Sequence, residues 1–265
     1  MNELDVSFFK NLAFYIFSIY IFVDTINILF NYNLYRKNNI FGSIFSKENN
    51  LISEYFKKSK VFVKLFSTSF IYLVIARLAL LIFVLLGYKI IFALFLIQLV
   101  IFYRNYLYMD ASEKLCLTIL FGFTIYDVFE IQSVKELGLL FICISIFIVY
   151  FSTAYHKIRS SIWKNGEVMP IIFSSESVEE QYFANYFYKN PKVSKIVCWG
   201  LMLFQLTFFL SLLNYNLLLL YLSLGVFFHL INMYFLKLYS FFIIFVSTYP
   251  IIYYFGVKIN WILFH

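Results

Sequence analysis

Long runs of apolar residues recur from one end of this chain to the other, and they limit what it can fold into. Each run is about 20 residues long, which is the length of helix that crosses a bilayer. The run over residues 139–150 is apolar on nearly every side, unlike the alternating pattern of a membrane β-barrel strand. With 63% apolar and 13% charged residues, a soluble globule would lack polar surface. The pattern therefore predicts an all-α integral membrane protein, a polytopic helical bundle.

The positions of the runs predict eight spans within one transmembrane domain over residues 1–265, with seven spans as the alternative. The region 65–103 is too long for one crossing, and Gly87-Tyr88-Lys89 offers a turn that divides it in two. Polar loops are expected over about 31–64 and 158–192. In the second loop, Ser177 and Glu180 predict the start of a short helix, and Asn190-Pro191 predicts the start of the next span. The other expected spans are 11–30, 114–128, 134–154, 193–213, 216–236 and 238–255.

Lysine and arginine collect in these two polar loops, whereas the alternate connections carry few of them. By the positive-inside rule both loops face the cytoplasm, and with eight spans both termini lie outside. The net charge of +7 then reflects topology and gives no reason to expect a nucleic-acid partner. The expected partner is the lipid bilayer, and the expected location is the cell membrane, crossed several times.

Ionisable residues inside the spans are the first candidates for function. Near the middle of a span such a group costs at least about 2.5 kcal/mol, so Asp24, Arg77, Asp127 and His229 each need a partner or a watery cavity. Asp24 and Arg77 differ in expected depth by only about 8 Å, which predicts a buried pair. An ion pair that fixes helix packing and a catalytic pair both remain open. No metal site is expected, because the three cysteines are far apart in apolar segments and fit packing roles.

Three further motifs follow one another along the chain. Arg104-Asn105 precedes Asp110-Ala111-Ser112; Ala154-Tyr-His-Lys157-Ile158 precedes Trp163-Lys-Asn-Gly166; and Phe228-His229 lies in a late span, before Phe241-Phe242. A lysine at the end of a span is ordinarily an interfacial residue that extends its amine to the membrane surface. That interpretation of Lys157 stands beside a functional one.

In their order and spacing, these motifs resemble the HTTM membrane domain, named for horizontal transfer, whose best-known members are the vitamin K-dependent γ-carboxylases. The resemblance covers most of the chain, from residue 11 to about 255. It implies that Lys157 is the base that deprotonates a reduced quinone and that His229 lies in the same intramembrane region. A lysine that acts as a base must be neutral part of the time, which desolvation favours.

The expected site combines the resemblance with the charge pattern. In the eight-span arrangement Lys157, His229, Arg104 and Asp24 fall towards one membrane face, so one cavity lined by all four is expected. Lys157 would be the base and His229 a hydrogen-bond partner or proton relay. Arg104 would clamp an anion or carbonyl, and Asp24 would be a counter-charge. The remaining candidates for substrate binding are Arg77, His156 and Trp163.

Two departures separate the chain from the carboxylases. Ala154 stands where many relatives have a glycine nearby, and nothing after the last span matches their large substrate-binding domain, so glutamate carboxylation is not expected. The carboxylases also act away from the cytoplasm, whereas the charge pattern places Lys157 on the cytoplasmic side. The chain looks closer to short bacterial HTTM proteins, including the membrane component of the machinery that matures a sporulation-delaying toxin peptide.

That likeness implies a small secreted peptide and a soluble partner protein. The leading hypothesis is a membrane enzyme, or the membrane subunit of one, that acts on a quinone-like lipid or in maturation of such a peptide. The alternative is a non-catalytic immunity or export factor that binds a toxic peptide. A transporter ranks third, because no span is visibly broken by paired glycine and proline.

Overall fold

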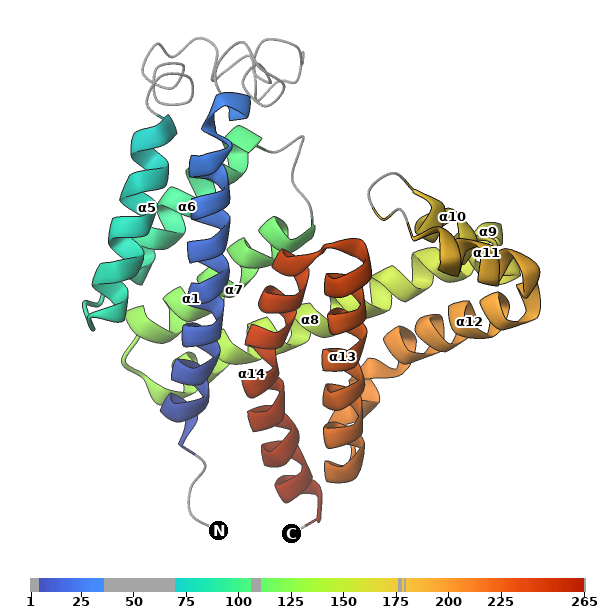
Figure 1. Cartoon of the computed structure of the whole chain (residues 1–265). Coiled ribbons are helices and arrows are strands. Elements are labelled where there is room, and N and C mark those ends of the chain that lie inside the picture. The colour runs from blue at the N-terminus through green and yellow to red at the C-terminus, as the bar shows by residue number, and fades with distance from the viewer. Residues whose placement is uncertain (1–4, 36–69, 106–110, 176–177, 179, 265) are drawn as a thin grey trace. The chain divides into compact units, whose positions relative to one another are not determined.

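The computed structural model describes residues 5–35, 70–105, 111–175, 178 and 180–264 (Figure 1). Every regular element in these ranges is helical, as the apolar pattern predicts. The elements are α1 (Val6–Phe30), η1 (Tyr32–Tyr35), α5 (Phe70–Leu85), α6 (Ile91–Asn105), α7 (Ala111–Val128), α8 (Gln132–Arg159), α9 (Ser161–Asn165), α10 (Val168–Ser174), α11 (Gln181–Lys189), α12 (Pro191–Thr207), η2 (Phe208–Leu212), α13 (Tyr215–Leu236) and α14 (Tyr239–Phe264).

Five helical segments of the described chain are long and apolar enough to cross a membrane: α1, α8, α12 with η2, α13 and α14. A multi-pass helical membrane protein is therefore confirmed, whereas the count of eight spans is not. The helices α5 and α6 have 16 and 15 residues, which is short for a crossing. The helix α7 has 18 residues, but it carries Glu113, Lys114 and Asp127.

The expected turn between the second and third apolar runs is present. Gly87, at φ +95°, lies between α5 and α6 in a conformation that other residues rarely adopt. The region 158–192 contains the short helices α9, α10 and α11, while most of 31–64, together with Asp110 and Ser177, lies outside the described residues. Pro191 opens α12 as expected, but the Asn190 side chain donates back to the Tyr186 carbonyl at the end of α11, 2.9 Å away.

The contacts divide the chain into two units, described separately below. The first unit comprises residues 1–13 and 140–265, and the second comprises residues 14–139. The second unit buries an aromatic cluster in which Phe123 contacts Phe14 and Phe17, with ring centroids 5.4 and 5.9 Å apart. The first unit packs Tyr150 of α8 on Phe208 of η2, with ring centroids 4.1 Å apart.

Candidate functional sites

Asp24 of α1 and Arg77 of α5 form the predicted buried pair in the second unit. The Arg77 Nη1 atom lies 2.8 Å from Asp24 Oδ2, and the two side chains are 1% and 13% exposed. Nη1 also donates to Gln98 Oε1 of α6, 2.9 Å away. Among the described residues the Nε and Nη2 atoms of Arg77 have no hydrogen-bond partner. One guanidinium thus joins three helices.

Arg104 lies at the carboxyl end of α6, also in the second unit. It is 3% exposed, its guanidinium lies 3.5 Å from the centroid of the Phe70 ring, and its Nη1 donates to Asn105 Oδ1 at 2.8 Å. A cation near the last carbonyls of a helix is favoured by the helix dipole. The Arg104-Asn105 motif is therefore a buried unit with contacts of its own.

Lys157 lies in the last turn of α8, in the first unit. Its Nζ donates to Gln205 Oε1 of α12, 3.0 Å away, and lies 4.4 Å from the ring centroid of Trp163 in α9. A glutamine oxygen and an aromatic face both stabilise an ammonium without neutralising it. Lys157 therefore keeps donors, or a lone pair when neutral, for a further partner.

The Trp163-to-Gly166 turn holds the tryptophan over Lys157 because it is fixed to α12. Gly166 ends α9 at φ +83°, and a Cβ there would lie 2.5 Å from the backbone nitrogen of Lys195. The Ser194 hydroxyl donates to the Gly166 carbonyl, and Trp199 Nε1 donates to the Lys164 carbonyl at 3.2 Å. Both the left-handed conformation and the close backbone approach require glycine at this position.

Lys157 lines a cavity of about 630 Å³, here called the Lys157 cavity. It lies among α8 to α13, and aromatic rings cover much of its wall. Lys157 and Asn232 are the lining residues with a charged or an amide side chain, and none of the lining residues is acidic. The aromatic wall includes Trp163, Phe173, Phe183, Phe187, Phe204, Phe227, Phe228 and Phe235. A large apolar cavity with few polar groups is typical of a small-molecule site.

His229 of α13 belongs to a separate buried cluster of the first unit and is not among the residues that line the Lys157 cavity. Its Nε2 shares a hydrogen bond with the Tyr150 hydroxyl at 2.8 Å, and Tyr150 shares one with the Tyr249 hydroxyl at 3.0 Å. The imidazole stacks on Phe245 with ring centroids 4.3 Å apart. Phe204 connects the two places, because it lines the cavity and its ring centroid lies 5.9 Å from that of Tyr150.

The structure thus brings together some of the expected site residues. Lys157 and Trp163 share the cavity. His156 is exposed on α8, where its ring contacts Tyr155. Asp24, Arg77 and Arg104 belong to the second unit, so one cavity shared by Lys157, His229, Arg104 and Asp24 stays a prediction.

Sequence reasoning did not single out the neutral polar partners. These are Gln98, Gln205, Asn232, Tyr150 and Tyr249. A glutamine or asparagine inside an apolar span is itself a signal, because a buried amide needs a partner. Tyrosine gives no such signal here, because the chain contains 23 of them.

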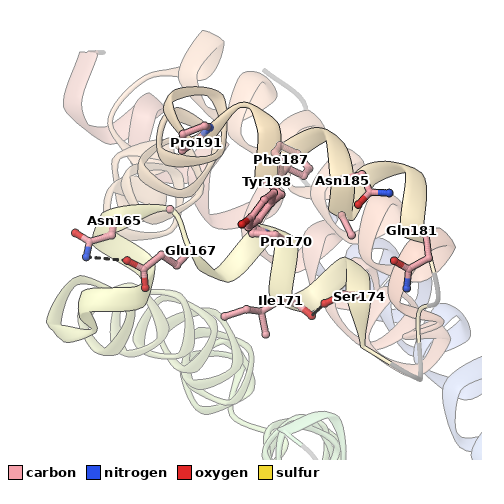
Figure 2. Close-up of a pocket in the computed structure, with 12 residues that line it drawn as sticks. Asn165, Glu167, Pro170, Ile171, Ser174, Gln181, Asn185, Phe187, Tyr188 and Pro191 are labelled. Atoms are coloured by element: carbon pink, nitrogen blue, oxygen red, sulfur yellow. Dashed lines mark hydrogen bonds between the residues drawn. The ribbon is translucent and has the colours of Figure 1, made fainter.

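A second pocket, of about 510 Å³, lies around α9, α10 and α11 in the first unit. Figure 2 shows Asn165 bonded to Glu167 beside the end of α9, while Asn185 and Tyr188 come from α11. Amide, hydroxyl and carboxylate groups line it together with Pro170 and Phe187. Phe187 also lines the Lys157 cavity, so the two spaces share this residue of α11.

No group of three or more His, Cys, Asp or Glu side chains that could hold a metal ion occurs in the part of the chain that the structure describes. Cys116, Cys143 and Cys198 are buried free thiols. At the Lys157 cavity and in the His229 cluster, the polar groups described above are an amine, amides and a histidine-tyrosine chain, which suit proton transfer and hydrogen bonding. Comparison of the chain with family models, with curated proteins and with solved structures finds no match.

Proposed function

We propose that this chain is a membrane enzyme, or the membrane subunit of one, of the HTTM type, in which Lys157 is the base for a quinone-like lipid. The observation that carries the proposal is the position of the Lys157 amine: it lies at an aromatic cavity whose lining contains no acidic residue. A neighbouring carboxylate would hold the amine in its charged form, whereas an apolar wall favours the neutral form that a base requires.

The contacts of Lys157 suit the transfer of a proton from a ring hydroxyl. Nζ accepts the proton, the O–H bond breaks, and the electron pair stays on the oxygen. The Gln205 oxygen at 3.0 Å orients the amine, and the Trp163 ring at 4.4 Å stabilises the ammonium that forms. The phenylalanine rings of the cavity offer faces for stacking on a ring ligand.

The wider setting is proposed with the same function. The five candidate spans, supplemented by α5, α6 and α7, make eight crossings of the cell membrane. Lipid around the spans would supply an apolar ligand by partition, so a water-soluble carrier is not needed. His229 bonds to Tyr150, whose ring contacts Phe204 of the cavity wall. His229 would therefore accept or release a proton without contacting the ligand.

Lys157→Met tests the base directly, because it keeps an unbranched apolar side chain and removes the amine. Purified protein in nanodiscs is mixed without oxygen with reduced menadione, and the phenolate absorbance band is followed. We expect the band to be lost in the variant, because no lining amine remains to accept the proton. Lys164→Met, at an exposed position in α9, is the matched control and should behave like the parent. A band of equal intensity in Lys157→Met at unchanged thermal stability would refute the proposal.

The second candidate is a non-catalytic immunity or export factor that binds a small secreted peptide. The pocket of Figure 2 favours it, because the amides of Asn165, Gln181 and Asn185 can pair with a peptide backbone. In that case Lys157 only ties α8 to α12 through Gln205. The parent protein would then give no phenolate band, and Lys157→Met would lower its thermal stability.

A further inference from the structure

We infer that the Lys157 cavity opens sideways into the bilayer between α12 and α13, and that its ligand is a single-chain amphiphile. The small oxygen-bearing head of this ligand lies at Lys157, and its apolar chain leaves between the two helices. This inference deepens the proposed function, on which it rests for the chemistry of the head group. The access route and the apolar chain of the ligand rest on observations other than those that support the proposed function.

The first observation is the exposure of the cavity wall. Gly200 of α12 lines the cavity and is exposed. Leu224, Phe227 and Ile231 of α13 also line it, and they are 43%, 62% and 37% exposed. A residue that both lines a cavity and is exposed lies at its mouth. We call these four residues the opening.

The second observation is that the opening lies on two candidate spans with further exposed apolar side chains. The helices α12 and α13 are both candidate spans, and they meet at η2 and diverge towards α10 and α11 in Figure 1. Neighbouring exposed side chains on the same helices are apolar, including Leu203 at 51% and Leu220 at 52%. A hydrocarbon chain can lie between such helices at little cost, because lipid tails are as apolar as leucine.

The third observation is that aromatic rings cover the cavity where α10 and α11 cross the end of α13. The ring centroid of Phe235 lies 5.6 Å from that of Phe173 and 5.1 Å from that of Phe183. Phe173 also stacks on Phe187 at 5.6 Å. All four rings line the cavity. Access from the α10–α11 side would therefore require these rings to separate, whereas the opening requires no movement.

The chemistry of the lining selects the ligand. Lys157 supplies a cationic or hydrogen-bonding point, Asn232 supplies an amide, and the other lining residues are apolar or aromatic apart from Gly200. A ligand with charges at several positions would leave them buried and unpaired. One oxygen-bearing head with one apolar chain satisfies both the lysine and the wall.

Gly200 provides a specific way to close the opening. A Cβ atom built there meets no heavy atom within 4 Å, so a side chain can be added without displacing the protein. Gly200→Ala should therefore be tolerated, and Gly200→Phe should place a ring in the opening. Phe227→Ala, on the opposite wall, should widen it.

Trp163 can report on occupancy, because it lines the cavity beside Lys157. Trp199→Phe and Trp261→Phe leave it as the sole tryptophan, and this double variant serves as the parent in phosphatidylcholine vesicles. A dibrominated stearate quenches tryptophan on contact, and unbrominated stearate is the control. We expect quenching in the parent and in Gly200→Ala, several-fold less in Gly200→Phe, and more in Phe227→Ala.

Quenching that is absent in the parent would overturn the inference, as would quenching that neither Gly200→Phe nor Phe227→Ala changes. If Gly200→Phe does not fold, the response of Phe227→Ala decides. The measurement needs no turnover, so it separates the two proposals. If quenching responds to the variants as expected but no Lys157-dependent phenolate band forms, the binding site for the apolar chain is supported and the role of Lys157 as a base is refuted. If the parent shows no quenching but the Lys157-dependent phenolate band forms, the role of Lys157 as a base is supported and the binding site for the apolar chain is refuted.

Discussion

Buried Arg77 and half-buried Lys157 each bind a glutamine, but their charge balance differs. Arg77 donates to Gln98 and also pairs with Asp24, 2.8 Å away. Lys157 donates to Gln205 and lines a cavity without any acidic residue. A structural ion pair neutralises a buried charge within the protein. Arg77 therefore fits a role in packing, and Lys157 is the cation that is left available to a ligand.

The role of Arg77 can be measured by removing its partner. Asp24→Ala leaves a guanidinium buried with only a neutral acceptor, so we expect the free energy of unfolding in detergent to fall by about 3–5 kcal/mol. Arg77→Ala should cost a similar amount. The double variant should cost clearly less than the sum of the two. Lys89→Ala, at an exposed position after α5, is the control and should stay within about 0.5 kcal/mol of the parent. Additive losses would show that the two charges do not stabilise one another.

The sequence located the charged residues of these sites better than their neutral partners. Asp24 and Arg77 could be paired because the cost of a charge in lipid demands a partner at similar depth. Gln98 and Gln205 were missed because an amide costs less in an apolar span, so its presence there is a weaker signal. Which helix lies beside which cannot be read from hydropathy. For that reason the sequence predicted one cavity lined by Lys157, His229, Arg104 and Asp24, but not Gln205 or the aromatic rings that lie beside Lys157.

At the scale of elements, α13 and α14 approach closely through one glycine on each helix. A Cβ on Gly225 of α13 would lie 2.3 Å from the Tyr249 hydroxyl of α14, and a Cβ on Gly256 of α14 would lie 2.6 Å from Leu218 of α13. Small residues let helix backbones approach in a membrane, where packing drives association. The Gly225 contact also sets the position of Tyr249, which bonds to Tyr150.

These two glycines should respond differently to the same substitution. Gly225→Ala meets a rigid ring whose hydroxyl is held by Tyr150, so α13 and α14 must separate or the hydrogen bond must break. Gly256→Ala meets the end of a flexible leucine, which can change rotamer. We expect the first variant to lower the melting temperature in detergent more than the second. Gly200→Ala, with open space around it, is the control. Equal losses for Gly225→Ala and Gly256→Ala would contradict the close fit at Tyr249.

Element boundaries were predicted well where a turn needs glycine and less well where polar residues continue a helix. The turn at Gly87 was found from the sequence. The helix α8 continues to Arg159, past the expected end at residue 154, because Lys157 and Arg159 suit the carboxyl end of a helix. The helix α14 continues past the expected residue 255, and Asn260 within it donates to the Leu212 carbonyl at 3.1 Å. A prediction from hydropathy places the end of a span at its first polar residues, whereas the helix itself continues beyond them.

At the scale of the whole chain, the helices α1 and α8 each contribute residues to both units. The first unit contains the cavity with Lys157, and the second contains the Asp24–Arg77 pair. Hydropathy alone predicted a multi-pass bundle. Backbone polar groups in lipid must be hydrogen-bonded within the protein, and a long apolar run achieves this by forming a helix. Hydropathy did not predict the two units, because they depend on side-chain packing between segments distant in sequence.

The orientation of the chain can be tested at α12, which with η2 is a candidate span. A helix that crosses the membrane has its two ends on opposite sides. Gly166 precedes this span and Asn214 follows it. Because lysine and arginine collect in the region 158–192, we expect residue 166 on the cytoplasmic side. Alkaline phosphatase, active only outside the cytoplasm, should be silent when fused after Gly166 and active when fused after Asn214. Immunoblots for equal amounts of both fusions are the control. The reverse pattern would place Lys157 near the outer face, where the carboxylases act, whereas equal activity of the two fusions would show that α12 does not cross.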